Sequence, residues 1–314
     1  MYYYLLSLIV LGTAPLAEAE ELEPFQALQA YSSLITSGAG HITEYSVWDE
    51  FGLQRWLEVQ RLLGSRAGRP IDDSRLFFIA FKEDKLRWEV VDTTQKSGTM
   101  YITDWRGVFV NGESKAVDYS RKLGEIVQSI GYINDSSPGP FNPSLDIRPS
   151  FLKVGIGEPI TELLRGRSEW LGQLTVQRLG PEMLDGLPCE RFRLSNNRAL
   201  VDIWLSREHR YLPARIEVKR LDRQPSSLYN RFVFQYTYKL YEDGIWFIDR
   251  IDIQNLWSFD GKEELFSHRT IQVEDDFRIN IDLPDDIFQI EFYKGQEVRV
   301  WQGRTYKVIR WGQE

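Results

Sequence analysis

The stretch Arg231-Phe-Val-Phe-Gln-Tyr-Thr-Tyr-Lys-Leu240 gives the clearest indication of the fold class. Every second side chain is apolar or aromatic, namely Phe232, Phe234, Tyr236, Tyr238 and Leu240. Most of the side chains between them are polar. Successive side chains of a β-strand point to opposite faces, so this alternation predicts a strand with one apolar face.

The rest of the C-terminal half repeats this pattern between turn signals such as Asp185-Gly186, 242–244, Asp260-Gly261 and Gln302-Gly303. The predicted strands are 173–179, 189–194, 200–205, 216–218, 231–240, 245–256, 265–273, 298–301 and 305–309. Successive hairpins with one apolar face each predict a strongly curved antiparallel sheet.

The N-terminal half mixes helical and strand patterns. A short amphipathic helix is predicted over 24–36, a strand over 41–48 and a second helix over 50–63. A hairpin turning at 82–85 would place Phe77, Ile79 and Phe81 on one face of its first strand, and Leu86, Trp88 and Val90 on one face of its second. A second hairpin is predicted from 101–103 and 108–110, with its turn at 104–107.

The middle of the chain departs from the strand pattern. Leu123, Ile126, Val127 and Ile130 have helical spacing, which predicts a helix over 115–130. The stretch 135–149 holds four prolines and is typical of a surface loop, and a short helix is expected over 159–164. We therefore expect a helical and proline-rich insertion at about 115–164 within one domain spanning 20–314.

The predicted fold class is mainly β (α+β), a strongly curved antiparallel sheet or half-open β-barrel. The apolar face of such a sheet must be covered. Because few helices are predicted, we expect them to cover the concave face, or the sheet to curl toward a barrel.

The first residues predict a signal peptide over 1–19. An apolar run from Leu5 to Leu11 is followed by Ala17-Glu-Ala19, the small-residue pattern of a cleavage site. The run is shorter than the roughly 20 residues of a spanning helix, so cleavage is preferred to an uncleaved anchor. We expect an exported protein, periplasmic or secreted, with no transmembrane segment once the signal is removed.

The net charge and the cysteine content argue against several classes of partner, covalent link and anchor. The net charge of −8 gives no general attraction to nucleic acid. Cys189 is the single cysteine, so no internal disulfide is expected and no cysteine follows the signal peptide to carry a lipid anchor. Burial as a small apolar side chain is the preferred interpretation of Cys189. We expect a monomer.

Known catalytic and metal-binding patterns are missing from the sequence. His41, His209 and His268 lie in no recognised motif, and solvated or pairing roles are preferred for His209 and His268. No cysteine and histidine cluster suits a metal, and Gly155-Ile-Gly157 lacks the rest of a dinucleotide fingerprint. A distant carboxylate pair of the glycosidase type stays open. We predict a protein that is not an enzyme and has no cofactor.

Aromatic residues make up 13% of the chain and ten of them are Trp. A β-sheet core explains most of them. An apolar lining for an acyl chain or similar ligand predicts the same strand pattern, so both interpretations stay open. The candidate lining residues are Phe77, Ile79, Phe81, Trp88, Phe232, Phe234, Tyr236 and Tyr238.

Several segments together resemble a known family. They are Asp185-Gly-Leu-Pro-Cys-Glu190, Val201-Asp-Ile-Trp-Leu-Ser206, Tyr211-Leu-Pro-Ala-Arg215, Tyr241-Glu-Asp-Gly-Ile-Trp-Phe247, Leu283-Pro-Asp-Asp-Ile-Phe288 and Gly295-Gln-Glu-Val298. In this order they resemble the LolA/LolB-like outer-membrane lipoprotein-sorting superfamily, in its large and poorly characterised bacterial branch. The resemblance implies a half-open barrel with helices across its mouth and a role in binding or carrying a lipid or acylated protein.

Two non-catalytic alternatives remain beside the lipid carrier. Tryptophans such as Trp105, Trp257 or Trp311 would suit a polysaccharide or another surface partner if they are exposed. Trp105 and Trp257 lie at or near predicted turns, where exposure and burial under a neighbouring loop are equally open. An open sheet edge would suit a protein partner. A wide concave cavity favours the carrier, a row of exposed Trp favours the polysaccharide binder, and a filled core with an open edge favours the protein binder.

Overall fold

The computed structural model describes residues 24–62, 73–96, 99–122, 125–134, 153–154, 158–168, 171–221, 231–259, 262–302 and 305–313. The predicted signal peptide at 1–19 and the predicted proline-rich loop at 135–149 lie outside these residues. The division of the chain into a leader and one domain stays a prediction.

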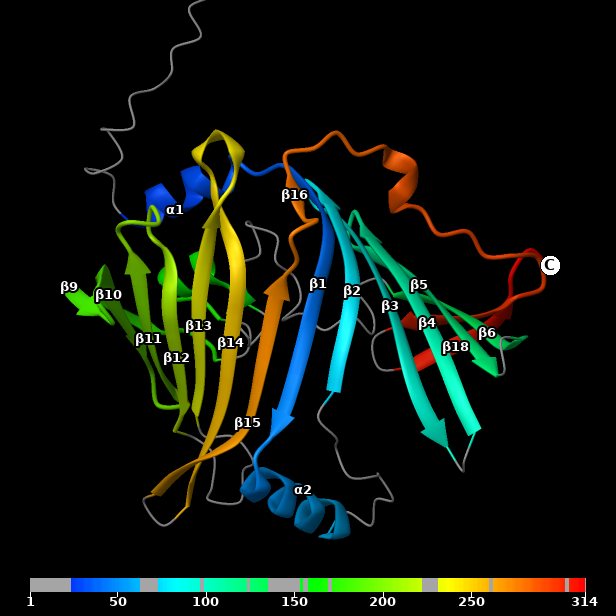
Figure 1. Ribbon diagram of the computed structural model, residues 1–314, viewed down its shortest axis with the longest axis horizontal. Helices are drawn as coiled ribbons and strands as arrows, with labels where there is room; N and C mark the ends of the chain where they lie inside the picture. Colours follow the sequence, from blue (N-terminus) through cyan, green and yellow to red (C-terminus); the bar gives the residue numbers. More distant parts are fainter. Residues whose placement is uncertain are drawn as a thin grey trace, which may run out of the picture.

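One large curved sheet of 16 strands dominates the molecule, and its two ends do not meet (Figure 1). Its strand order is β18-β17-β6-β5-β4-β3-β2-β1-β15-β14-β13-β12-β11-β10-β9, with β16 paired to β1. Within the described strands of this sheet, neighbours are antiparallel except β6 and β17, which run parallel. The predicted mainly β fold class is confirmed.

The strands of the N-terminal half are β1 (Ser37–Trp48), β2 (Asp73–Lys82), β3 (Lys85–Lys96), β4 (Thr99–Val110), β5 (Glu113–Lys122) and β6 (Glu125–Asn134). Those of the C-terminal half are β9 (Thr175–Leu184), β10 (Leu187–Ser195), β11 (Ala199–Ser206), β12 (Leu212–Arg220), β13 (Arg231–Leu240), β14 (Trp246–Phe259), β15 (Lys262–Val273), β16 (Arg278–Ile279), β17 (Glu297–Gln302) and β18 (Thr305–Arg310). A separate pair is β7 (Lys153–Val154) and β8 (Glu158–Pro159).

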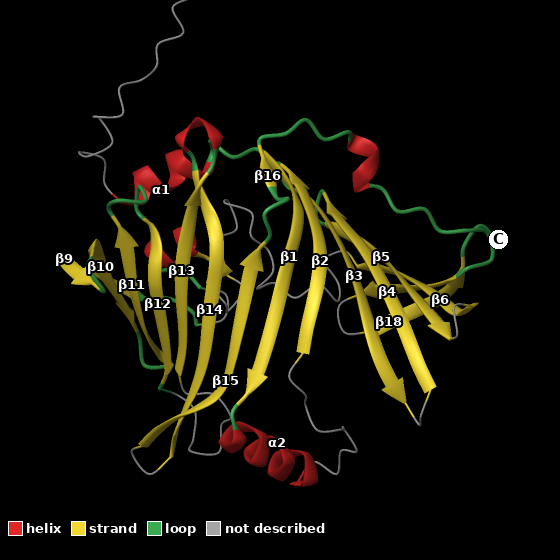
Figure 2. Ribbon diagram, viewed as in Figure 1, coloured by secondary structure: helices red, strands yellow, loops and turns green. Residues whose placement is uncertain are grey.

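Among the described residues, three α-helices accompany the sheet. Figure 2 draws helices in red and labels α1 and α2. They are α1 (Pro24–Ser32), α2 (Glu50–Leu62) and α3 (Ile160–Leu164), with short 3-10 turns η4 (Glu242–Gly244) and η5 (Asp285–Phe288). All three helices lie where the sequence pattern predicts them. Within the part of the chain that the structure describes, no helix has both the length and the apolar character needed to cross a bilayer.

The tight turns follow from their residues. Asn111-Gly112 and Asp185-Gly186 have φ angles of 52° and 81°, and of 50° and 87°. Positive φ at both central positions is the geometry of two-residue hairpin loops, which asparagine, aspartate and glycine adopt at low cost. The turn predicted at Asp185-Gly186 is therefore confirmed.

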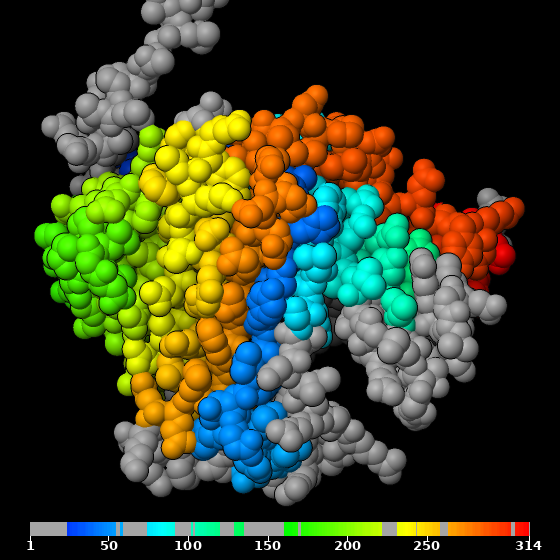
Figure 3. Space-filling model, viewed as in Figure 1, coloured from blue at the N-terminus to red at the C-terminus, as the bar shows by residue number. Residues whose placement is uncertain are grey.

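The concave inner face of the sheet carries the main core. Its side chains come from both halves of the sheet and from α1 and α3, and they include Leu28, Ile79, Leu163, Ile203 and Phe234. Strand β1 joins the halves, because it pairs with β2 on one side and β15 on the other. The space-filling view in Figure 3 shows this arrangement as blue between cyan and orange.

The outer face of the N-terminal half is covered by residues 281–292, which we call the strap. Leu283 and Phe288 of the strap pack against Ala80, and Phe292 packs with Val117 and Val298. In Figure 1 the strap is the orange segment that leaves β16 and passes over the ends of β2 to β5. This half of the sheet therefore buries side chains on both faces.

Three local predictions are wrong. Residues 115–130 form parts of β5 and β6 rather than a helix. The turn predicted at 104–107 lies inside β4, where Arg106 donates to Asp104 at 2.9 Å and Gly107 lies beneath the indole of Trp88. Leu240 is 53% exposed and does not continue the apolar face of β13.

The strap and a β-bulge explain two of these wrong predictions, those for residues 115–130 and for Leu240. Because Ala116 and Val117 are both buried, β5 lacks the alternation by which a strand is recognised. In β13, the pairing with β14 shifts between Thr237 and Tyr238, so the alternation is broken before Leu240, which is exposed.

Candidate functional site

The predicted lining residues lie together on the inner face. Phe77, Ile79, Phe81, Trp88, Phe234 and Tyr236 belong to the main core, and Phe232 and Tyr238 pack against it. Their role as a ligand lining stays a prediction. The structure shows which side chains surround them.

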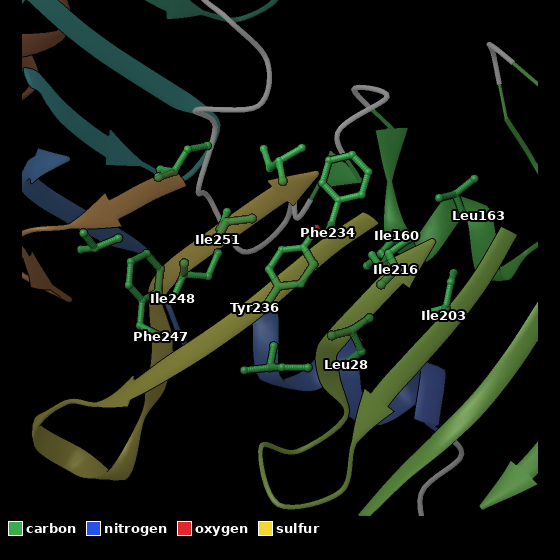
Figure 4. Close-up of a cluster of buried hydrophobic side chains, with 14 of the residues drawn as sticks. Leu28, Ile160, Leu163, Ile203, Ile216, Phe234, Tyr236, Phe247, Ile248 and Ile251 are labelled. Carbon is green, nitrogen blue, oxygen red and sulfur yellow. The ribbon is translucent and has the colours of Figure 1, made fainter. Parts of the chain in front are cut away.

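In the C-terminal half, helices occupy the space over the inner face. Leu28 of α1 and Ile160 and Leu163 of α3 belong to the same cluster as Phe234 and Tyr236 (Figure 4). Leu163 is 0% exposed and Phe234 is 2% exposed, so this part of the core is dry and closely packed. A ligand that used Phe234 would have to displace these helices.

The two halves also meet through aromatic rings near the end of the sheet where the strap begins. Phe247 of β14 stacks on Phe81 of β2 at 6.4 Å and on Phe277 at 5.4 Å between ring centroids. Phe277 is fully buried. These rings join the two halves of the curved sheet across its concave side.

Buried tyrosines tie this core together. Tyr238 donates a hydrogen bond to the carbonyl oxygen of Pro213 at 2.7 Å, and Tyr31 of α1 donates one to the carbonyl oxygen of Trp246. Burial raises the pKa of the Tyr236 and Tyr238 phenols well above the ordinary value, so both remain neutral at physiological pH.

His209 is not the solvated turn residue that the sequence suggests. Its ring lies 4.6 Å from the Trp246 ring and 5.2 Å from the Tyr238 ring. Its Nδ1 atom is buried without a hydrogen-bond partner among the described residues. Burial lowers the pKa of His209, and the nearby Glu208 opposes this shift only in part. The half-buried imidazole therefore packs as a neutral ring against Trp246 and Tyr238.

His268 has the predicted pairing role. Its Nε2 atom lies 3.1 Å from Asp252 Oδ1, and Asp252 also accepts hydrogen bonds from Arg250 and Thr270. Burial favours a higher pKa for Asp252, but the hydrogen bonds from Arg250 and Thr270 lower it overall. This group lies on the outer face and holds neighbouring strands together.

A different part of the inner face stays partly open. We call Trp105, Tyr132, Trp301 and Tyr306 the aromatic strip, which crosses from β4 through β6 to β17 and β18. The Trp105 and Tyr132 rings are 5.6 Å apart, and the Trp301 and Tyr306 rings are 4.8 Å apart. Trp105 and Tyr132 touch the edge of the main core.

Arg299 joins the two pairs of rings. Its guanidinium lies 5.9 Å from the Tyr132 ring centroid and 5.4 Å from the Tyr306 ring centroid. The strand register places Arg299 opposite Tyr132 on one side and Val308 on the other. Residues opposite each other in a sheet share a face, so Arg299 and Val308 belong to the same surface as the strip.

Charges adjoin the strip at its centre. Arg299 Nε lies 3.5 Å from a carboxylate oxygen of Glu297. Burial and the Asp118 carboxylate raise the pKa of Tyr132, and the Arg299 cation opposes this shift. The strip thus offers flat aromatic rings beside a cation whose charge is partly balanced.

The aromatic strip is more accessible to solvent than the filled part of the core. The Tyr306 side chain is 47% exposed and Val308 is 54% exposed, whereas Trp105, Tyr132 and Trp301 are half-buried. Apolar side chains that remain accessible on a concave face can contact a ligand without displacing a helix.

The three tryptophans considered as candidates for a surface site differ in their positions. Trp257 is 5% exposed and lies 5.8 Å from the Phe51 ring of α2, so of the two alternatives left open for it, burial holds. Trp311 is half-buried and packs at 5.1 Å on Phe292 of the strap. Only Trp105 of the three belongs to the strip.

Sequence reasoning missed Tyr132, Arg299, Trp301 and Tyr306 as site residues. The alternation within the last hairpin indicates that Trp301 and Tyr306 are cross-strand neighbours. It does not indicate that β17 joins β6, because parallel pairing between segments so far apart leaves no local signal.

Cys189 is free and buried, as predicted, and burial raises the pKa of its thiol to about 11. Its environment of Trp204 and Ala214 is apolar. Among the described residues, no group of histidine, cysteine and acidic side chains could hold a metal ion.

No protein-family model matches the chain, and no curated protein matches its sequence. The resemblance to the LolA/LolB-like superfamily therefore stays a prediction.

Solved structures similar to this chain include three proteins. A DUF1329 family protein from Desulfovibrio piger has 10% identity and a TM-score of 0.42, with 85% of this chain and 95% of that chain covered. A porin-like protein from Bacteroides uniformis has 9% identity and a TM-score of 0.25, covering 78% and 96%. MucB in complex with MucA(peri) has 9% identity and a TM-score of 0.19, covering 82% and 98%. Since all three TM-scores are below one half, we infer function below from the geometry of the chain itself.

Proposed function

We propose that this chain is an exported cell-envelope protein that binds an apolar, lipidic ligand without catalysing a reaction, and that the ligand lies on the aromatic strip. The observation that carries the proposal is the partial exposure of Trp105, Tyr132, Trp301 and Tyr306 on a concave face whose other part is already filled.

The energetics suit a hydrocarbon chain. Each methylene group removed from water contributes about 0.8 kcal/mol. Aromatic rings offer large apolar surfaces with little conformational entropy to lose. A chain lying across the strip would bury its methylene groups against the rings without requiring any polar motif in the protein.

Arg299 gives the ligand a polar anchor. A guanidinium that lies over aromatic rings keeps donors available for an oxygen-rich headgroup. The ligand class that fits best is therefore an amphiphile with an apolar tail and a polar or anionic head. This site replaces the predicted lining at Phe234 and Tyr236, which helices α1 and α3 cover.

The first test is native mass spectrometry of the protein purified from its own envelope, followed by organic extraction. We expect a co-purifying lipid or acylated peptide in near-stoichiometric amount. A fluorescent fatty acid then measures affinity, and Tyr306→Ser should weaken its binding roughly fivefold, as expected for loss of about 1 kcal/mol of aromatic contact.

Tyr293→Ser is the matched control, because Tyr293 is 56% exposed and lies outside the strip. It should leave the affinity unchanged. Equal effects of the two variants, or a protein that binds neither lipids nor the fatty acid, would contradict the proposal. Binding of an oligosaccharide in place of the fatty acid would instead support a polysaccharide-binding role for the same rings.

A further inference from the structure

The sheet has two end strands, β9 and β18, and no described strand pairs with the outer side of either. The outer side of an edge strand presents backbone N–H and C=O groups that can pair with another chain. Natural proteins protect such edges with bulges, prolines and charged side chains.

The β9 edge carries two of these protections. Pro181 lies within the strand and has no backbone N–H, and the adjacent Gly180 has a φ of 96°. The pairing of β9 with β10 also shifts between Arg191 and Phe192. An added strand could not follow this edge continuously.

The β18 edge has neither a proline nor a bulge, and of the protections named above it carries only the charges of Lys307 and Arg310. Its six residues, Thr305–Arg310, contain no proline or glycine, and their pairing with β17 has no shift in register. Tyr306 is 47% exposed and Val308 is 54% exposed. These side chains offer an apolar row to a neighbouring strand.

The backbone of β18 is oriented for pairing on that side. The N–H of Trp311, the residue that follows β18, donates to the Gln296 carbonyl oxygen at 2.9 Å. The backbone N–H of Trp311 therefore faces the β17 side. Hydrogen-bonded and non-hydrogen-bonded positions alternate along an antiparallel pair. By this alternation, the N–H and C=O groups of Tyr306 and Val308 point away from β17.

The charged side chains of β18 indicate which kind of strand would pair with its outer edge. Residues 305–310 include Lys307 and Arg310 but no acidic residue. In antiparallel pairing of two copies centred on Lys307, the two Lys307 side chains would lie opposite each other, and like charges at such a position destabilise pairing. An acidic strand would place opposite charges across the junction.

We propose that β18 accepts an extended acidic segment of a partner protein as an added strand. Apolar side chains of that segment would pack beside Tyr306 and Val308 on the inner face. Its alternating acidic side chains would lie beside Lys307 on the outer face. Backbone hydrogen bonds would provide affinity, and the side-chain pattern would provide specificity.

The test uses the peptide acetyl-Glu-Val-Glu-Val-Glu-Val-amide with a fluorescent label, titrated with the full chain and followed by anisotropy. We expect saturable binding, and binding at least roughly tenfold weaker for the peptide with Lys in place of Glu. Amide exchange should slow at Tyr306 and Val308 when the acidic peptide binds, because their N–H groups become hydrogen bonded.

Two variants test the edge itself. Val308→Pro removes an outward N–H group while the ladder to β17 is retained, and should weaken peptide binding at least roughly tenfold. Lys307→Glu should reverse the preference, so that the lysine peptide binds more tightly than the acidic one. Its matched control is Lys294→Glu, which makes the same change of charge at an exposed lysine outside the strand.

Thermal midpoints of all variants are compared with that of the unchanged chain. If Val308→Pro does not fold, the charge reversal alone decides the outcome. The proposal is overturned if the acidic peptide does not bind, or if Lys307→Glu and Lys294→Glu behave alike. It is also overturned if the chain self-associates through β18, shown by dimers that Lys307→Glu changes and Lys294→Glu does not. Fatty-acid affinity, measured in parallel, tests the proposed lipid site separately.

Discussion

At the scale of single residues, His209 shows how burial can turn a titratable group into a packing element. Its ring contacts Trp246 and Tyr238, and Tyr31 of α1 bonds to the same Trp246 residue through the backbone. The charged group that acts on its imidazole is Glu208, whose effect is smaller than that of burial. A proton on His209 would place a positive charge at a half-buried position where water solvates it poorly.

This arrangement predicts a loss of stability in acid. The folded-state pKa of His209 is lowered, so the unfolded chain takes up the proton first as pH falls below the ordinary value of about 6.5. The His209 contribution is complete above that pH and decreases below it until the folded-state pKa is reached. Urea unfolding midpoints at pH 7.5 and about pH 5.5 should differ more for the unchanged chain than for His209→Phe.

The control for this prediction is His268→Gln, in which His209 is intact. It should keep the larger difference between the two pH values. An unchanged pH dependence in His209→Phe would show that carboxylates elsewhere cause the acid effect.

At the scale of elements, the sequence predicts strands well where one face is buried and the other is solvated. The bounds predicted for β13 match the structure residue for residue, because its aromatic face packs on the core and its other face is largely polar. The hairpin of β2 and β3 and the final hairpin follow the same rule.

Secondary structure is predicted wrongly where a segment that is distant in sequence packs on a strand or where the strand pairing is irregular. The strap buries Val117 on the outer face of β5, and the pairing of β5 with β6 shifts between Ser120 and Arg121, so the apolar residues of these two strands do not alternate. The candidate site is predictable only in part for the same reason. Trp105 stands out in the sequence, but its neighbours Tyr132, Trp301 and Tyr306 are gathered by a parallel pairing that has no local signature.

Helix α1 contributes to stability in a way that can be tested separately. Leu28 is 1% exposed and packs over the inner face, so Leu28→Ala should lower the free energy of unfolding by about 2–5 kcal/mol through lost burial and a residual cavity. Leu34→Ala, at a position that is 46% exposed, should change it by less than about 0.5 kcal/mol. Urea titrations of both variants measure the difference, and similar values for the two would show that α1 does not pack as described.

At the scale of the whole molecule, the curved sheet should unfold as one unit if the stability of each half depends on contacts with the other half. β1 and the rings of Phe81, Phe247 and Phe277 connect them. We therefore expect one cooperative unfolding transition, with tryptophan fluorescence and far-ultraviolet circular dichroism changing together.

Phe277→Ala should lower the midpoints of both signals in parallel, at a cost of about 3–5 kcal/mol, because Phe277 is fully buried between the halves. Tyr293→Ala removes an exposed ring and should have little effect. Two separated transitions in the unchanged chain would show that the halves fold independently and would argue against the single domain expected for 20–314.

The parallel pairing of β17 with β6 also bears on the order in which the chain folds. Strand β6 is synthesised long before residues 297–302, so its edge has no native partner until the end of the chain has been made. Contacts between such distant segments slow folding, and an unpaired strand edge is prone to misassembly while it waits. The slowest native contacts to form would then be those of β17, and with them the aromatic strip would be completed last.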